Sequence, residues 1–341
     1  CIRDRLISTI LSKMILQTGC TTLMTVEVPY GENRIGLGME EFVADGVIHL
    51  RAIRLEERLF RDLSIKKMRG TEIKENEIAF TIKDGFKALT PFETEPIERR
   101  EKFKPIPDPP GMFSTGSEDL DELIGGGYPK GSTVLLEIGR NISILQYHLV
   151  LSPTPWDFLA KGANVIVIPS SGVDHGIIWK RAADSGLRKE TLNRHLRICV
   201  FKSPEIRKEP YIVEFEGKDI DEDFRRYLKV VANLHEETHQ PVLNIIGTDR
   251  LLSNYGIEDT LRILNSSTTI IREQGSLGIL LLKPYYPQVS DILNSIVDVH
   301  FKMVREHGAL LLYGLKPRTH LNFVEMDVSK GYPLPKLTPI V

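Results

Sequence analysis

Short apolar runs and amphipathic stretches take turns along most of this chain. Between residues 133 and 282, apolar runs typical of buried strands are separated by segments of helical period. Strands that alternate with helices in this way predict a parallel, doubly wound sheet of the α/β class. The expected strands are 133–137, 164–168, 196–201, 242–246 and 278–282, and the expected helices are 176–184, 221–238 and 257–273. From residue 299 on, turns at 307–308 and 330–331 predict an antiparallel extension.

The first 110 residues follow a different pattern. Residues 1–18 have helical period and end at Gly19, after which short strands are expected at 21–25, 47–50, 61–67 and 80–82, with a hairpin turn at 84–85. Residues 90–110 are rich in proline and charge without any period, so they predict an extended linker. The sequence opens on Cys1 and passes directly into the helix pattern, which predicts a piece of a longer protein.

Composition narrows the class of protein. The chain has 341 residues, enough for about two domains of ~150 residues each. It is 41% hydrophobic and 26% charged, as ordinary globular proteins are, and its net charge of −2 disfavours nucleic acid as a partner. The apolar runs are too short to cross a membrane. Three cysteines without metal-ligand spacing predict a reducing, cytoplasmic compartment.

Residues 112–137 carry the most informative motif, MFSTGSEDLDELIGGGYPKGSTVLLE. This run resembles the entry to the RecA-type ATPase core of the KaiC family, where a buried strand leads into a G-x-x-x-x-G-K-[ST] phosphate loop. Here residues 138–146 read IGRNISILQ, which has neither Gly-Lys-Ser nor Gly-Lys-Thr. A phosphate loop needs glycines, a lysine and a hydroxyl. Of that loop only Gly139 and Ser143 remain as candidate nucleotide-binding residues.

Two segments of the chain also resemble each other, which indicates an internal repeat. Residues 1–88 and 257–341 share an order of helix, short strand, a valine-aspartate strand start and a basic pair, which is Lys67 and Arg69 in the first copy and Lys316 and Arg318 in the second. The first copy is similar to the C-terminal half of a KaiC-type domain. The resemblance therefore implies three parts: residues 1–89 as half of a first RecA-like domain, 90–110 as a linker, and 111–341 as a complete second domain with a degenerate nucleotide site.

The family resemblance assigns a role to the first basic pair. Lys67 and Arg69 match a K-x-R-G motif that acts as a trans-acting finger, reaching the γ-phosphate bound by a neighbouring subunit of a ring. Fixed cations suit the charge that develops in phosphoryl transfer. The alternative is a solvated basic strand face. For Lys316 and Arg318, where Pro317 removes a ladder donor, the alternative of a surface basic pair is preferred.

Two further parts of the ATP machinery are missing from the second copy. The family's Mg²⁺-binding aspartate aligns with Gly247, and Asp249 stands two residues later as a doubtful nucleotide-site residue. Residues 169–173 lack the paired catalytic glutamates, and the nearby Asp174 fits the N-terminus of a helix. No metal site is expected, because His235 and His239 fit a solvated helix face.

These losses together predict a pseudo-ATPase second domain. The resemblance implies a KaiC-like ATPase that binds ATP and Mg²⁺ in its first domain, while nothing in the present chain is expected to hold either one. It also implies a homo-oligomeric ring, with a protein partner as a further possibility. Archaeal gas-vesicle regulators of GvpD type are candidate relatives. The alternatives are a non-catalytic ring-forming scaffold and a DNA recombination or repair ATPase, and the second is disfavoured by the near-neutral charge.

Overall fold

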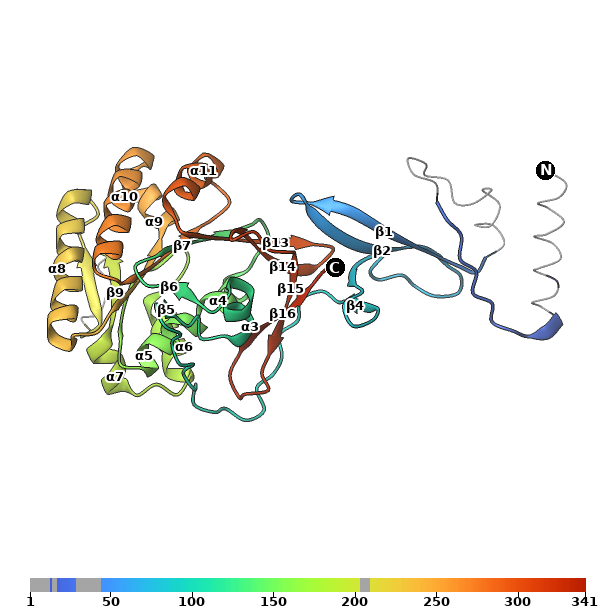
Figure 1. Ribbon diagram of the computed structural model, residues 1–341, viewed down its shortest axis with the longest axis horizontal. Coiled ribbons are helices and arrows are strands. Elements are labelled where there is room, and N and C mark those ends of the chain that lie inside the picture. The colour runs from blue at the N-terminus through green and yellow to red at the C-terminus, as the bar shows by residue number, and fades with distance from the viewer. Residues whose placement is uncertain (1–12, 14–16, 29–43, 203–208) are drawn as a thin grey trace.

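The computed structural model describes residues 13, 17–28, 44–202 and 209–341 (Figure 1). It contains a four-stranded sheet near the N-terminus and an α/β body built on a ten-stranded sheet. Most of the helix expected over 1–18 lies outside these residues. The strand expected at 21–25 is not formed, and Leu23 there is 93% exposed. An apolar segment becomes a strand only when a neighbouring strand pairs with it, and this segment has no such neighbour among the described strands.

The four-stranded sheet is antiparallel throughout, in the order β1 (Gly46–Leu55), β2 (Arg58–Met68), β3 (Glu77–Thr81) and β4 (Lys87–Leu89). Its first hairpin turns through Glu56 and Glu57, both with positive φ, as two-residue hairpin loops require. The β3–β4 turn uses Asp84 and Gly85, also at positive φ, as expected from the sequence.

The ten-stranded sheet has the order β10-β9-β8-β11-β12-β7-β13-β14-β15-β16. Neighbours from β10 to β13 are parallel, and neighbours from β13 to β16 are antiparallel, so the α/β class and the antiparallel extension are both confirmed. The strands are β7 (Thr133–Ile138), β8 (Asn164–Ile168), β9 (Leu196–Phe201), β10 (Ile212–Phe215), β11 (Val242–Gly247), β12 (Leu277–Leu282), β13 (Val299–Glu306), β14 (Ala309–Lys316), β15 (Asn322–Asp327) and β16 (Leu334–Pro339). A separate pair, β5 (Met112–Phe113) and β6 (Tyr128–Pro129), flanks the first helix of the body.

Helices cover both faces of the parallel part of this sheet. One face carries α4 (Ile144–Leu151), α5 (Pro153–Ala160), α6 (His175–Asp184) and α7 (Lys189–His195), and α3 (Glu118–Ile124) joins the same hydrophobic cluster. The other face carries α8 (Ile220–Thr238), α9 (Thr248–Tyr255), α10 (Ile257–Glu273) and α11 (Pro287–Ile296). Burial on both faces explains why strands such as β8 and β12 are wholly buried, nearly continuous apolar runs.

The two sheets pack against each other through a third hydrophobic cluster, at the place where β1 and β2 meet β14–β16 in Figure 1. Arg58 crosses this joint: its side chain is 6% exposed, donates to the carbonyl oxygens of Thr319 at 2.8 Å and Gly314 at 2.6 Å, and lies over the Tyr313 ring. The buried side chains of the joint are Phe60, Ala79, Leu89, Ala309, Leu311, Tyr313, Leu321, Phe323 and Ile340.

The segment 90–110 has no helix or strand, but it is attached to the α/β body along its length. Backbone N–H groups of Glu101 and Phe103 donate to the carbonyl oxygens of Gly331 and Ser185. The Phe103 ring is 1% exposed and contacts Trp156 and Tyr332. The proline-rich segment therefore runs as a fixed strap over the body.

We expect the joint to contribute strongly to stability. Phe60→Ala removes a fully buried ring and should lower the free energy of unfolding by about 3–5 kcal/mol in urea denaturation. Leu59→Ala is the matched control, because Leu59 directly precedes Phe60 on β2, points to the opposite face and is 41% exposed. That control should change the free energy by less than about 1 kcal/mol. Equal effects of the two changes would contradict the packing.

Candidate functional site

The carboxyl ends of β7, β8, β11 and β12 meet at one edge of the parallel sheet, where ligands bind in open α/β sheets. The segments that follow these strands hold Gly139, Ser143, Ser170, Lys283 and, in the first turn of α9, Asp249. Gly139, Ser143 and Asp249 were expected from the sequence, and the structure brings them to this edge. Lys67, Arg69, Lys316 and Arg318 lie elsewhere.

The loop between β7 and α4 closes on itself. Ser143 is the N-cap of α4: its Oγ accepts from the Gln146 N–H at 3.3 Å, and its own N–H donates to Gln146 Oε1 at 2.8 Å. This reciprocal pair is a capping box. It uses a helix N-terminal amide that would otherwise be available to an anion. Ile144 and Leu145 follow, so the first turn presents apolar side chains, and Leu145 is 39% exposed.

Gly139 has a packing role. Its N–H donates to the Met303 carbonyl oxygen at 2.9 Å, and a Cβ at this position would lie 2.6 Å from the same oxygen. The residue is therefore glycine because β13 passes directly over it. Packing against β13 is therefore enough to explain the glycine, and no phosphate ligand is needed to explain it.

The end of β11 is closed by the loop after β8. A Cβ on Gly247 would lie 2.5 Å from the Ser170 N atom and 2.6 Å from its Cα. No side chain fits there unless one backbone moves. The sequence resemblance aligns Gly247 with the family's Mg²⁺-binding aspartate, and the backbone around Gly247 leaves no space for a carboxylate.

Asp249 begins α9 and is 4% exposed. Its Oδ2 accepts from the Ser171 N–H at 3.0 Å and lies 3.6 Å from Lys283 Nζ, and Lys283 also donates to the Ser171 carbonyl oxygen. These contacts tie β8, β11 and β12 together at their ends. The other oxygen, Oδ1, is buried without a hydrogen-bond partner. The predicted role of Asp174 as a helix N-terminal residue is confirmed, since it caps α6 through the Gly176 N–H.

Glu137 is an acidic residue that sequence reasoning missed, although a lone acid inside the apolar run of β7 was a visible signal. It accepts from Ser290 Oγ at 2.6 Å and lies 3.3 Å from His300 Nε2 and 3.4 Å from Lys302 Nζ. Burial alone would raise the pKa of Glu137, but the hydrogen bonds from His300 and Ser290 bring it below its usual value. The carboxylate therefore stays charged and joins β7 to β13 and α11.

The two basic pairs occupy equivalent places. The β1–β2 register shifts between Val47 and Ile48, opposite Lys67, and the β13–β14 register shifts between His300 and Phe301, opposite Lys316. A β-bulge in the same place in both hairpins supports the internal repeat.

The environments of the two pairs differ. Lys316 Nζ donates to the carbonyl oxygens of Asn294 and Val297 at the end of α11, and Arg318 Nη2 donates to the Glu57 carbonyl oxygen at 3.0 Å. Arg69, in contrast, is exposed and forms an ion pair with Asp45 at 3.2 Å, a neighbour that the sequence pattern did not reveal. Lys67 lies at the end of β2 that is remote from the joint, roughly 30 Å along the strand from Arg58.

Among the residues that the structure describes, no three His, Cys, Asp or Glu side chains are grouped so that they could hold a metal ion. His235 faces the Gln240 carbonyl oxygen at 3.1 Å on the exposed side of α8. None of the described helices is long and apolar enough to cross a bilayer.

Comparison with known proteins finds similarity in both parts of the chain. Residues 2–90 match the family model described as KaiC ATPase, and residues 102–193 match the model described as GvpD basic region 2. The chain is 26% identical to protein GvpD2 and 24% identical to protein GvpD1 of Halobacterium salinarum, over 88% and 87% of its length. It is 34% identical to circadian clock protein KaiC3 of Synechocystis over 40% of its length, or 27% of that protein.

The chain is therefore similar to the KaiC-like branch of the RecA superfamily. It is related to the GvpD proteins and spans 63% of the length of GvpD2 and 65% of the length of GvpD1. The RecA-like fold expected for this KaiC-like chain is confirmed by the large, mostly parallel sheet with helices on both faces.

Gly247→Ala tests the closure of β11. The added Cβ has no space beside Ser170, so we expect the free energy of unfolding to fall by about 1–3 kcal/mol. Ser170→Gly in the same chain should not restore it, because the contacts are to backbone atoms. Chemical denaturation of the single and double variants provides the measurement, and full tolerance of Gly247→Ala would show that this edge is more open than described.

Proposed function

We propose that this chain is a portion of a KaiC-like ATPase whose second domain, residues 111–341, is non-catalytic and serves regulation or assembly. The observation that carries the proposal is the contact between Gly247 and Ser170, which excludes a carboxylate where Mg²⁺ would be held. The capping box of Ser143 and Gln146 also supports a non-catalytic second domain, and so does the absence of an acidic residue over 169–173. Each change removes a different part of ATP chemistry.

In this proposal residues 1–89 are the C-terminal half of a first RecA-like domain, and residues 90–110 are the strap between the domains. ATP and Mg²⁺ would be bound and used by that first domain in the full-length protein. Support comes from the match of residues 2–90 to the KaiC ATPase family and from the greater length of the GvpD relatives. By the same relationship, a role like that of the gas-vesicle regulators of GvpD type is the preferred biological setting.

Lys67 and Arg69 are the proposed catalytic residues, acting in trans across a ring of subunits. They lie at the end of β2 that points away from the α/β body in Figure 1, where a neighbouring subunit could reach them. Their counterparts are held inside the chain, Lys316 by α11 and Arg318 by the turn at Glu57. This difference between the two pairs supports the choice of Lys67 and Arg69 over Lys316 and Arg318.

A non-catalytic scaffold is the second candidate. Its support is the outer face of the β1–β2 hairpin, where Ile48 and Leu50 are 54% and 53% exposed. Apolar side chains on an edge strand are typical of surfaces that pair with another chain. ATP hydrolysis by the full-length protein discriminates between the two candidates.

The 341-residue chain should not bind Mg-ATP with useful affinity, because the loop before α4 offers no lysine and caps its own helix. Isothermal titration calorimetry is the measurement. A micromolar dissociation constant would mean that other residues hold the phosphates, and the non-catalytic assignment of the second domain would then be wrong.

Arg69→Ala in the full-length protein should lower the ATPase rate by about 10³-fold if the guanidinium contacts transition-state charge. Stability should change little, since Arg69 is exposed. Lys74→Ala, at a nearby exposed lysine, is the matched control and should keep the parent rate.

Mixing separates action in trans from action in cis. Arg69→Ala subunits combined with subunits that carry a defective phosphate loop should regain activity at the mixed interfaces. If the mixture assembles yet regains none, Arg69 does not act on a neighbour. Full ATPase activity of the Arg69→Ala protein alone would contradict the catalytic role, and Lys67 and Arg69 would then be solvated basic residues on a strand face.

A further inference from the structure

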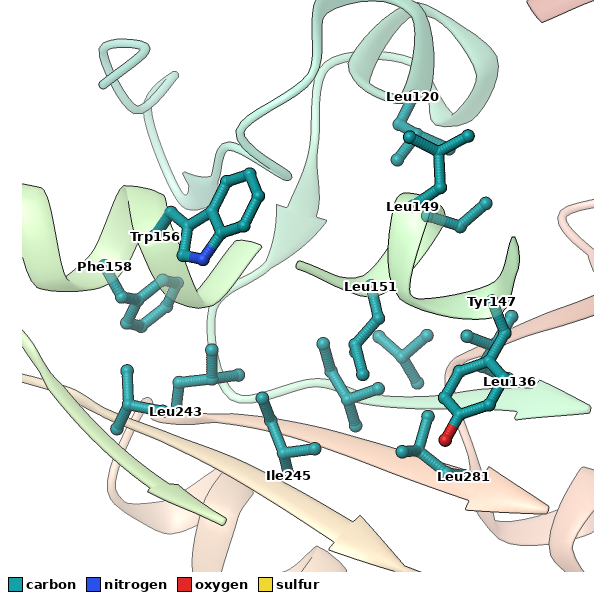
Figure 2. Packing of buried hydrophobic residues seen from close by; sticks show 14 of the residues in the cluster. Leu120, Leu136, Tyr147, Leu149, Leu151, Trp156, Phe158, Leu243, Ile245 and Leu281 are labelled. Carbon is teal, nitrogen blue, oxygen red and sulfur yellow. The ribbon is translucent and has the colours of Figure 1, made fainter. Parts of the chain in front are cut away.

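A small cavity lies in the second domain between helices α4–α6 and the face of the parallel sheet. Its volume is about 50 Å³. Most of its wall is apolar, and Figure 2 shows several of these side chains between the helices and the strands. The apolar lining includes Leu151, Trp156, Leu159, Val167, Ile245 and Leu281.

Three polar groups line the same cavity without partners of their own. The Tyr147 hydroxyl and the Ser170 hydroxyl belong to side chains that are 1% and 3% exposed, and neither has a hydrogen-bond partner. In Figure 2 the Tyr147 hydroxyl points from α4 toward the sheet, beside Leu281. Buried hydroxyl groups without partners are uncommon, because each loses its hydrogen bonds to water on folding.

Arg181 is the third polar side chain of the cavity, and it carries a positive charge. It extends from α6 into the cavity lining, and within the described part of the chain no carboxylate forms an ion pair with it. Burial lowers the pKa of Arg181, and the one nearby group that acts in the opposite direction is Tyr147. A half-buried cation without a counter-charge has lost part of its hydration, so a bound anion would stabilise it.

The neighbouring ionisable residues do not offset the preference of the cavity for an anion. Burial, with Arg181 and Lys283 nearby, lowers the pKa of His148 to about 3, so the imidazole is neutral at physiological pH. Asp249 is close enough to affect Tyr147, but it forms its own ion pair with Lys283 at 3.6 Å. Arg181 is therefore the unbalanced charge at the cavity.

The size of the cavity decides what kind of anion fits. Nucleotide-sized ligands occupy pockets of roughly 300–1,000 Å³, several times this volume. A water molecule needs about 10–15 Å³ of such space, so the cavity has room for about three to five non-hydrogen atoms. A bare inorganic anion would leave the apolar walls without contacts, whereas a carboxylate with a very short aliphatic chain would use both the polar groups and the walls.

We propose that this cavity is a binding site for a short-chain monocarboxylate of the size of acetate or propionate, held by Arg181, Tyr147 and Ser170. The ligand's methyl end lies among the apolar side chains beneath α4 and α5. The site is independent of any ATP role and gives the non-catalytic domain a small-molecule input.

Trp156 provides a direct readout, because it lines the cavity and the chain has two tryptophans, the other being Trp179. In a Trp179→Phe background, sodium acetate, propionate, octanoate, chloride and phosphate are titrated at constant ionic strength while Trp156 emission is recorded. Acetate and propionate should give saturable changes, with propionate about fourfold tighter for its extra methylene. Octanoate should give no saturable change, and Mg-ATP should not displace propionate, because neither fits in about 50 Å³.

Two variants test the polar end. Arg181→Met should abolish the saturable change, and Tyr147→Phe should weaken propionate about tenfold, as expected for the loss of one hydrogen bond to a charged group. Tyr147→Phe removes a hydroxyl without a partner in the free protein, so its unfolding temperature should not fall. Lys180→Gln is the matched control: it removes an exposed positive charge from the same helix and should leave affinity unchanged.

Several results would overturn the proposal. They are the absence of a saturable response to acetate and propionate, equal affinity for chloride and propionate, or unchanged propionate affinity in folded Tyr147→Phe protein. A rise in unfolding temperature with propionate in the parent but not in Arg181→Met would support it by a second measurement.

Discussion

The parallel sheet of the second domain is buried on both faces, and the rest of the molecule is arranged around that constraint. A strand without access to water must place every backbone N–H and C=O group in the ladder, and it must have apolar side chains on both sides. Strands β8 and β12 satisfy both conditions. Because the strands run parallel, their carboxyl ends and the loops that follow them converge on one edge.

At that edge the loops of the chain contact one another closely. Gly247 lies against Ser170, Gly139 lies under Met303, and Ser143 caps the N-terminus of α4. Three contacts made by different loops fill this edge, so its closure does not depend on a single residue. The small cavity beneath α4 extends to Ser170 at the end of β8, and its volume of about 50 Å³ is far too small for a nucleotide.

The joint between the two sheets gives the basic pairs their different environments. The tip of the β1–β2 hairpin rests on β14, where Arg58 bonds to the backbone beside Arg318 and Glu57 holds Arg318 itself. The same hairpin, fixed at its tip, carries Lys67 and Arg69 at its other end. An equivalent motif is thus held within the chain in one copy and exposed near Asp45 in the other.

The sequence by itself determined the α/β class, the strand pattern and the missing phosphate-loop residues, because apolar period and side-chain chemistry are local properties. It located β8, β9 and α10 at the residues where the structure has them, since each is bounded by clear turn signals. The helices α4 and α5 were not predicted, because their segment is apolar without a helical period and contains two prolines. Only the tertiary structure decided which buried groups lack partners. The contact of Gly247 with Ser170, the place of Glu137 and the cavity at Tyr147 and Arg181 join residues far apart in the chain, and no local pattern records such distances.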